Sequence, residues 1–196
     1  MKVLICFINL LAGILFITPS SAQQYRIFIN PSSRVTVYGS TNVNQFKFRY
    51  TENISIDRPV KVDSENKILK LSGCQIDLKI HAFDSGNPIM NKDFRKMLNE
   101  DESPFIRVNL LSLAPEWERG GSWRKGKVEV LVEINTIAKK FVFDCTLENP
   151  GSLYIFGRQR ISLTEFELTP PTRMMGMVRV SEWVDLDLEL RFGTDG

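Results

Sequence analysis

The strongest fold signal in this sequence is the stretch VDLDLELRF at residues 184–192, in which apolar and charged side chains alternate without a break. Successive side chains of a β-strand point to opposite faces of the sheet, so this pattern predicts a long strand with one apolar face and one charged face. The apolar parity extends back to Val178 and Val180, so the predicted strand covers residues 178–192, and the charged parity carries Arg179, Asp185, Asp187, Glu189 and Arg191. Because arginines share this face with the carboxylates, we interpret it as a solvated outer surface rather than a cation site.

The same period of two recurs along most of the chain. It is clear at residues 45–50, 75–82, 128–134 and 141–147, and weaker at 25–30, 34–38, 67–71, 105–113 and 153–168, the last with a break near Gly157. A turn near residues 135–139 joins two of these segments as a hairpin. Only residues 88–99 have helical spacing, between Asn87-Pro88 as a start signal and Ser103-Pro104 as a stop. The pattern predicts an all-β fold, an antiparallel sandwich or closed barrel of eight to ten strands with one short helix.

Composition limits the classes of function. The chain has 196 residues, of which 43% are hydrophobic, and 25 Lys and Arg against 23 Asp and Glu give a net charge of +2. A nucleic-acid-binding domain needs a basic excess to displace counterions from phosphates, so no nucleic-acid partner is predicted. The apolar content supports a packed core in one domain, and the pattern specifies no oligomeric state.

The first 22 residues have the features of a secretory signal. Lys2 precedes an apolar run at residues 3–17, and Ser20 and Ala22 occupy the −3 and −1 positions of a small-residue cleavage site. The run of 15 residues is shorter than the roughly 18 to 20 that span a bilayer. We therefore expect a signal peptide at residues 1–22, a mature domain at 23–196, and a periplasmic or secreted location.

Two of the three cysteines, Cys74 and Cys145, remain in the expected mature domain. Each lies on the apolar parity of its segment, so both face an interior. In an oxidising compartment they could form a disulfide, or they could be buried free thiols, and the sequence leaves these alternatives open.

Four stretches, in order, resemble the YceI-like proteins of the Bacteroidetes type. They are SSRVTVYGSTNVNQF at residues 32–46, GNPIMNKDFRKML at 86–98, VEVLVEINTIAKKFVF at 128–143, and LTEFELTPPT at 163–172 followed by Met175-Gly176. The resemblance implies a lipocalin-like antiparallel β-barrel of about eight strands that holds a polyisoprenoid or other lipid. This sequence has Asn42-Val43-Asn44 where many relatives carry a histidine-containing turn, a departure that bears on polar contacts to a ligand head group.

With this resemblance, the inward apolar parities become candidate ligand-binding residues. They are Phe46, Phe48, Ile76, Leu78, Ile80, Phe141, Phe143, Leu186, Leu188 and Leu190. The interior of an eight-stranded barrel is either filled by side chains or just wide enough for one ligand. The alternative is therefore a filled barrel that acts through its surface as a protein-interaction or envelope-stress module. No cofactor is predicted beyond a bound isoprenoid or other lipid.

Two further segments are candidates for contacts at the barrel ends. The methionine-rich connection at residues 170–177 is either an adaptable lid over an apolar opening or loop packing. Trp117 and Trp123 flank a short turn followed by Arg124, Lys125 and Lys127. Such a tip either touches an anionic membrane surface transiently or packs its tryptophans over the end of the barrel.

Catalytic chemistry has little support in the sequence. His81 is the single histidine and lies on the polar parity of its segment, away from any serine or cysteine nucleophile pattern. Metal-ligand spacings are missing, and residues 84–87 are interpreted as a turn rather than a calcium loop. We expect a binding protein, with no catalytic residues and no metal.

Overall fold

A computed structural model describes residues 23–25, 27–56, 59–119, 123–149 and 152–194. The predicted signal peptide lies outside these residues. In the described part of the chain, no helix has the length and apolarity needed to cross a membrane.

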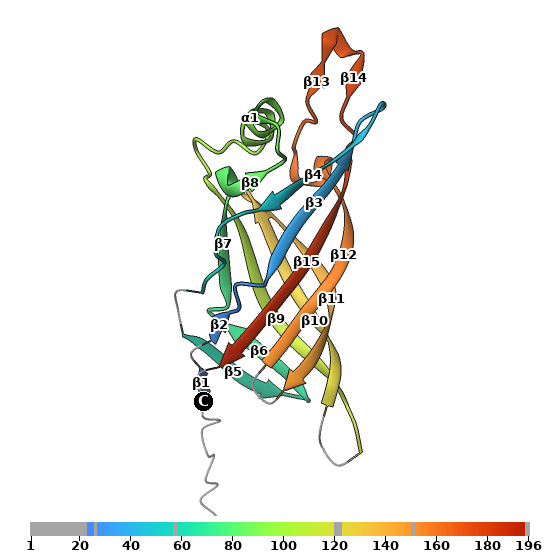
Figure 1. Cartoon of the computed structure of the whole chain (residues 1–196). Coiled ribbons are helices and arrows are strands. Elements are labelled where there is room, and N and C mark those ends of the chain that lie inside the picture. The colour runs from blue at the N-terminus through green and yellow to red at the C-terminus, as the bar shows by residue number, and fades with distance from the viewer. Residues whose placement is uncertain (1–22, 26, 57–58, 120–122, 150–151, 195–196) are drawn as a thin grey trace, which may run out of the picture.

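The fold is a curled antiparallel sheet with one α-helix (Figure 1). Thirteen of the strands belong to this sheet, and two short strands form a separate hairpin. The short strands at or near the edges are β1 (Gln23–Tyr25), β2 (Ile27–Ile29), β5 (Val60–Glu65), β6 (Ile68–Ser72) and β8 (Phe83–Asp84). The walls are β3 (Arg34–Ser40), β4 (Gln45–Tyr50), β7 (Gln75–Lys79), β9 (Phe105–Trp117), β10 (Trp123–Ile134), β11 (Ile137–Asn149), β12 (Ser152–Ser162) and β15 (Trp183–Thr194). The separate hairpin is β13 (Thr172–Arg173) and β14 (Val178–Arg179).

One chain segment links the two ends of the curled sheet. The walls follow the order β9-β10-β11-β12-β15-β3-β4, and β7 pairs with β9 while β8 pairs with β4. Because β7 and β8 are joined only by the 3₁₀ helix Ile80–Ala82 (η1), residues 75–84 run beside β9 first and β4 last. The sheet thereby curls into a barrel, as the alternating sequence pattern predicts.

The barrel has two ends of different character (Figure 1). The β3–β4 turn, the β10–β11 turn, the helix α1 (Pro88–Met97) and the β13–β14 hairpin lie at one end, which we call the mouth end. The C-terminal ends of β9 and β11 and the N-terminal ends of β10 and β12 lie at the other end.

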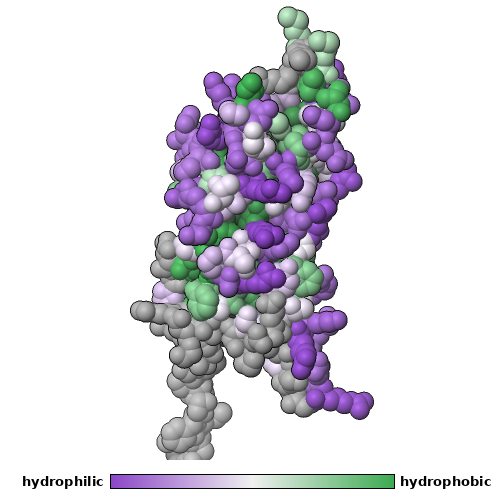
Figure 2. Space-filling model, in the orientation of Figure 1, coloured by the Kyte–Doolittle hydropathy of each residue, from purple (hydrophilic) through white to green (hydrophobic). Residues whose placement is uncertain are grey.

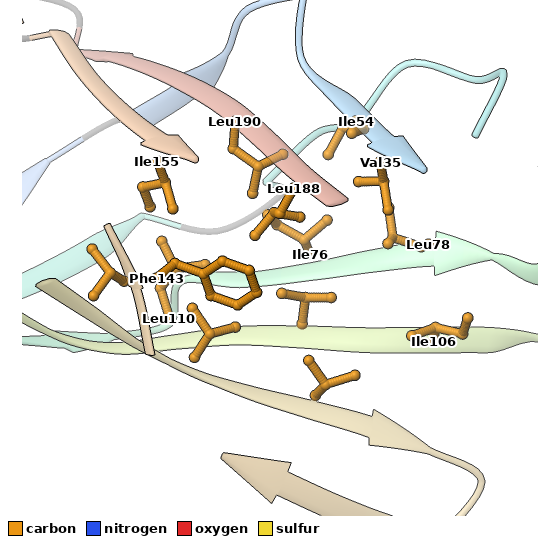
Figure 3. Close-up of a cluster of buried hydrophobic side chains, with 14 of the residues drawn as sticks. Val35, Ile54, Ile76, Leu78, Ile106, Leu110, Phe143, Ile155, Leu188 and Leu190 are labelled. Atoms are coloured by element: carbon orange, nitrogen blue, oxygen red, sulfur yellow. The ribbon is translucent and has the colours of Figure 1, made fainter. Parts of the chain in front are cut away.

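The interior away from the mouth end is filled. Figure 3 shows apolar side chains of β3, β7, β9, β11, β12 and β15 converging in the barrel interior. Ile76, Ile155 and Leu190 are each at most 1% exposed. Burial of this kind contributes about 1.5 to 3 kcal/mol per large side chain, so the filled part stabilises the fold strongly.

The helix α1 begins and ends close to the predicted limits. The Asn87 side chain accepts hydrogen bonds from the amides of Ile89 (2.9 Å) and Met90 (3.3 Å), and Pro88 occupies the first helical position. These are standard N-terminal features because the first amides of a helix have no partner within it.

The prediction of eight to ten strands is too low, since fifteen are present in the described residues. Of the missed strands, β8 and β13 have two residues each, too few to display a period of two. The predicted last strand is divided in the structure, with β14 at Val178–Arg179 and β15 beginning at Trp183. The expected break near Gly157 is also wrong, because β12 runs through it without interruption. A Cβ at Gly157 would lie 3.2 Å from the Phe143 ring, so this glycine leaves room for a core side chain. The chain after Ser162 forms the 3₁₀ helix Leu163–Phe166 (η2) rather than more strand.

Candidate ligand-binding cavity

The mouth half of the barrel encloses a cavity of about 640 Å³. This volume lies within the range of small-molecule sites, roughly 300 to 1,000 Å³. The barrel-wall residues that line it are Val35, Val37, Phe46, Phe48, Leu78, Ile106, Val108, Val130, Val132, Ile134, Phe143, Ile161, Val184, Leu186 and Leu188. The remaining side chains around it come mainly from α1, η2, the β3–β4 turn and the residues flanking the β13–β14 hairpin.

The floor of the cavity is the upper surface of the filled core. Val35, Phe143 and Leu188 line the cavity and also belong to the buried cluster drawn in Figure 3. Leu190 follows Leu188 on the same face of β15 but lies below this floor, outside the lining. The cavity therefore ends blindly inside the barrel, and its most exposed apolar lining residues, Val43 and Ile89, mark the opening at the mouth end.

An aromatic cluster holds α1 against the barrel wall. The Phe94 ring stacks on Phe48 of β4, with centroids 4.2 Å apart, and lies 5.6 Å from Phe83 of β8. Phe46 meets Phe48 edge to face at 5.8 Å. Phe94 is buried, and Met90 and Met97 on the same helix also line the cavity. The helix thus supplies part of the wall of the cavity rather than lying on the outside of the barrel.

The loop before α1 is fixed by a polar network. Asp84 Oδ1 accepts hydrogen bonds from Asn91 Nδ2 (2.6 Å) and the Gly86 amide (3.1 Å), while Asn91 Oδ1 accepts from the Ser85 hydroxyl (2.7 Å). The Asn91 hydrogen bond, followed by the backbone donors, holds the pKa of Asp84 below its usual range. Residues 84–87 therefore form the predicted turn, which sets the start of the helix.

The polar lining residues lie at the mouth end and are Thr41, Asn44, Asn87 and Asp93. The Thr41 hydroxyl donates to Asn44 Oδ1 at 2.9 Å, and Asn87 caps the helix. Every other lining residue is apolar, so the interior presents an almost wholly apolar surface. Such a surface selects a ligand by shape and length more than by hydrogen bonds.

The β13–β14 hairpin is fastened to the β3–β4 turn across the mouth end. Asn42 Nδ2 donates to the Met177 carbonyl (2.9 Å), and Asn42 Oδ1 accepts from the Arg179 amide (3.0 Å). A bridge between Thr41 and Val180 continues this pairing. The methionine-rich connection is therefore a structured hairpin at the opening, and the Asn42-Val43-Asn44 turn uses its polar side chains internally.

The structure brings six of the ten predicted ligand-binding residues to the cavity. They are Phe46, Phe48, Leu78, Phe143, Leu186 and Leu188.

The other four predicted residues do not line the cavity. Ile76 and Leu190 lie in the filled core, Ile80 is buried in η1, and Phe141 is half-buried on β11. The common apolar parity predicted an inward direction correctly for Ile76 and Leu190. It could not predict their depth, because depth depends on which other segments fill the barrel at that level.

Sequence reasoning missed the contribution of the helix to this site. Met90, Phe94, Met97 and Leu98 all line the cavity. Their helical spacing was visible in the sequence, but no pattern indicated that this face closes one side of a barrel.

The aromatic and basic tip predicted around Trp117 lies at the end of the barrel opposite the mouth end (Figure 1). The Trp117 indole Nε1 donates to the Lys67 carbonyl at 3.0 Å, so this tryptophan packs on the β5–β6 turn. The Trp123 side chain lies outside the described part of the structure. The tip is therefore not adjacent to the opening of the cavity.

Cys74 and Cys145 are buried free thiols in the structure. Burial raises the pKa of both thiols to about 12, because the thiolate would lose its hydration in the core. Neither thiol lines the cavity.

His81 is half-exposed on the outside of the barrel. Its ring nitrogens lie 3.4 Å from a Glu52 oxygen and 3.3 Å from a Glu100 oxygen. Glu52 also pairs with Lys79 at 2.9 Å, and this hydrogen bond lowers the pKa of Glu52. Among the described residues, no three His, Cys, Asp or Glu side chains are placed to hold a metal ion together.

The charged face of β15 is an outer surface, as the sequence predicts. Asp187 pairs with Arg158 of β12 at 2.8 Å, and the Arg158 guanidinium lies 4.6 Å from the Tyr38 ring centroid. Cross-strand pairs of this kind are ordinary features of a solvated sheet face.

Comparisons with known proteins find solved structures that are similar to this fold. None of the protein-family models or curated proteins compared with the chain matches it. The crystal structure of BcnA from Burkholderia cenocepacia is similar at 15% identity, with a TM-score of 0.57 over 83% of this chain and 98% of that one. A polyisoprenoid binding domain from Saccharophagus degradans, implicated in plant cell wall breakdown, is similar at 9% identity, with a TM-score of 0.61 over 87% of this chain and 99% of that one.

A YceI protein from Campylobacter jejuni also matches, at 15% identity and a TM-score of 0.47 over 80% of this chain and 85% of that one. BcnA and the Saccharophagus degradans domain, both with TM-scores above 0.5, share the fold of this chain, which agrees with the barrel that the predicted YceI-like resemblance implies.

Proposed function

We propose that this protein is an exported binding protein that holds a polyisoprenoid or other lipid-like chain in the cavity and performs no covalent chemistry on it. The observation that carries the proposal is the apolar cavity of about 640 Å³, closed by a packed floor and open at the mouth end. The Saccharophagus degradans protein, a polyisoprenoid binding domain on the same fold, supports the same ligand class.

The proposed mechanism is transfer of chain carbons from water into the barrel. Each buried CH₂ contributes about 0.8 kcal/mol, so a long chain binds well with few polar contacts. The apolar tail lies toward Val35, Phe143 and Leu188 at the floor, and any polar head group stays at the mouth end beside Asn44 and Asp93. The cavity favours this reading over a filled barrel that acts only through its surface.

The proposed cellular location rests on the predicted signal peptide. A signal peptide at residues 1–22 would deliver the domain to the periplasm or the exterior, where a carrier for water-insoluble chains is useful. N-terminal sequencing of protein recovered from that compartment tests this part, with Gln23 as the expected first residue.

Native mass spectrometry tests the binding function directly. Protein purified from its own compartment should carry a discrete added mass that disappears after denaturation and organic extraction. Ligand-free protein should regain a mass when it is incubated with isoprenoid alcohols of graded length. An unchanged mass after incubation with both isoprenoid and acyl lipids would contradict the proposal.

A further inference from the structure

The most exposed large apolar side chains of the described residues gather at the opening of the cavity. Val43 is 67% exposed, Ile89 61%, Met177 69%, and Met175 is fully exposed. The next in order, Val142 on the side of the barrel, is 52% exposed. We call these four residues at the mouth end the mouth rim.

Three separate segments build the mouth rim. Val43 lies in the β3–β4 turn, Ile89 in the first turn of α1, and the two methionines at the tip of the β13–β14 hairpin. Figure 2 shows hydrophobic surface at the end of the molecule formed by this hairpin. Large apolar side chains that are exposed to water at one end of a molecule indicate a contact site.

The mouth rim is held in place by its own hydrogen bonds. The contacts of Asn42 with Met177 and Arg179 fix the hairpin to the β3–β4 turn, and the Arg179 Nε donates to the Gly176 carbonyl at 2.9 Å. The tip adopts left-handed backbone conformations at Met175 (φ 54°) and Gly176 (φ 89°). The methionine side chains are therefore presented outward by a defined turn.

The mouth rim is continuous with the cavity. Val43 and Ile89 line the cavity and are also the outermost apolar residues beside it. A chain that leaves the cavity thus passes over apolar surface directly to whatever the rim touches.

Cationic side chains flank the rim. Lys92 and Lys96 are exposed and follow Ile89 at helical spacings of three and seven, so they lie on the same side of α1. Arg179 is exposed on the hairpin. Apolar tips with lysine and arginine beside them are the pattern of surfaces that rest in the head-group region of an anionic bilayer.

We propose that the mouth rim docks on an anionic lipid bilayer, with Val43, Ile89, Met175 and Met177 inserted among the head groups and the cavity opening facing the membrane. The inference rests on the proposed function, because the bilayer is then the source or the destination of the bound chain. It places membrane contact at the mouth end, opposite the Trp117 tip.

Vesicle flotation tests the proposal with the purified protein. Vesicles of phosphatidylcholine and phosphatidylglycerol at 7:3 should carry the protein to the top of the gradient. The Val43→Ser/Ile89→Ser variant should reduce the bound fraction at least tenfold. The matched control Val142→Ser/Ile68→Ser changes the same residue types on exposed barrel positions away from the rim and should bind vesicles like the parent.

Charge and ligand binding are measured separately. Each of Lys92→Gln and Lys96→Gln should weaken vesicle association by about fivefold at low salt, since a lysine near an anionic surface contributes about 1 kcal/mol. Met175→Ser/Met177→Ser should lose vesicle association but keep its affinity for a soluble short-chain isoprenoid, because neither methionine lines the cavity.

The outcomes separate this inference from the proposed function. Normal isoprenoid binding without vesicle association would overturn the bilayer contact while leaving the proposed function intact, and the rim would then be a protein-docking surface. Equal vesicle binding by the rim variants and the control would also overturn it. Rim-dependent vesicle association without any isoprenoid binding would support the contact and refute the proposed ligand.

Discussion

The substitution Val132→Phe should stabilise the ligand-free protein, an unusual result for a small-to-large change at a buried site. Val132 is 3% exposed and lines the cavity on β10. Phenylalanine adds four carbon atoms, which at about 0.8 kcal/mol per buried carbon sets an upper limit of about 3 kcal/mol. Both residue types favour strands, so the backbone gives no opposing term.

Val128→Phe is the matched control on the same strand and the same face. Val128 is completely buried and does not line the cavity. Extra carbons at a filled position force neighbours out of their preferred rotamers, at a cost of about 1 to 3 kcal/mol. The two variants should therefore change the free energy of unfolding in opposite directions.

Urea unfolding of ligand-free protein, followed by tryptophan fluorescence, measures both free energies. The same proteins are then titrated with an isoprenoid alcohol. If the new ring at residue 132 expels two CH₂ groups of the ligand, affinity falls more than tenfold, because 1.4 kcal/mol corresponds to a factor of ten. A loss of stability in Val132→Phe as large as that in Val128→Phe would refute the reasoning that the mouth half is hollow.

Four other predictions concern the wall of the cavity and the core. Phe94→Ala should lower the free energy of unfolding by about 3 to 5 kcal/mol in urea and weaken ligand binding, because the stacking that holds α1 on Phe48 is lost; a cost below 1 kcal/mol would contradict this anchor. Asn87→Ala should cost about 1 kcal/mol and Asn87→Gly only a few tenths, measured by thermal unfolding, and equal losses would argue against the cap. Under reducing conditions Cys74 and Cys145 should resist a thiol reagent at pH 8 until the protein unfolds, and immediate labelling would contradict their burial. The pKa of both thiols, about 12, exceeds the usual 9, so the native state keeps protons that the unfolded state loses above pH 9. The free energy of unfolding should therefore fall above pH 9, by about 1.4 kcal/mol per thiol at pH 10. The Cys74→Ala/Cys145→Ala variant should lack this fall.

The long strands of the barrel wall could be predicted because each has one buried face and one solvent-exposed face. Strands such as β15 and β10 are long enough to repeat the alternation several times, and α1 is marked by Asn87 and Pro88. The β5 strand, with apolar residues only at Val60 and Val62, repeats it too few times to be recognised.

The cavity could be predicted only in part, for a different physical reason. Leu186, Leu188 and Leu190 share one parity of β15, yet only the first two line the cavity. The filled level is completed by residues such as Ile54 and Val60, which come from segments with weak or no strand pattern. Alternation therefore indicates which side chains point inward, while depth depends on long-range packing across the barrel.

The packed floor beneath Val35, Phe143 and Leu188 has a kinetic consequence. A cavity with one opening offers a single path, so an occupant has to depart before its successor can go in. Exchange of one bound chain for another should then proceed at the dissociation rate of the first, whatever the concentration of the second. A barrel open at both ends would instead let an incoming chain push the resident one out.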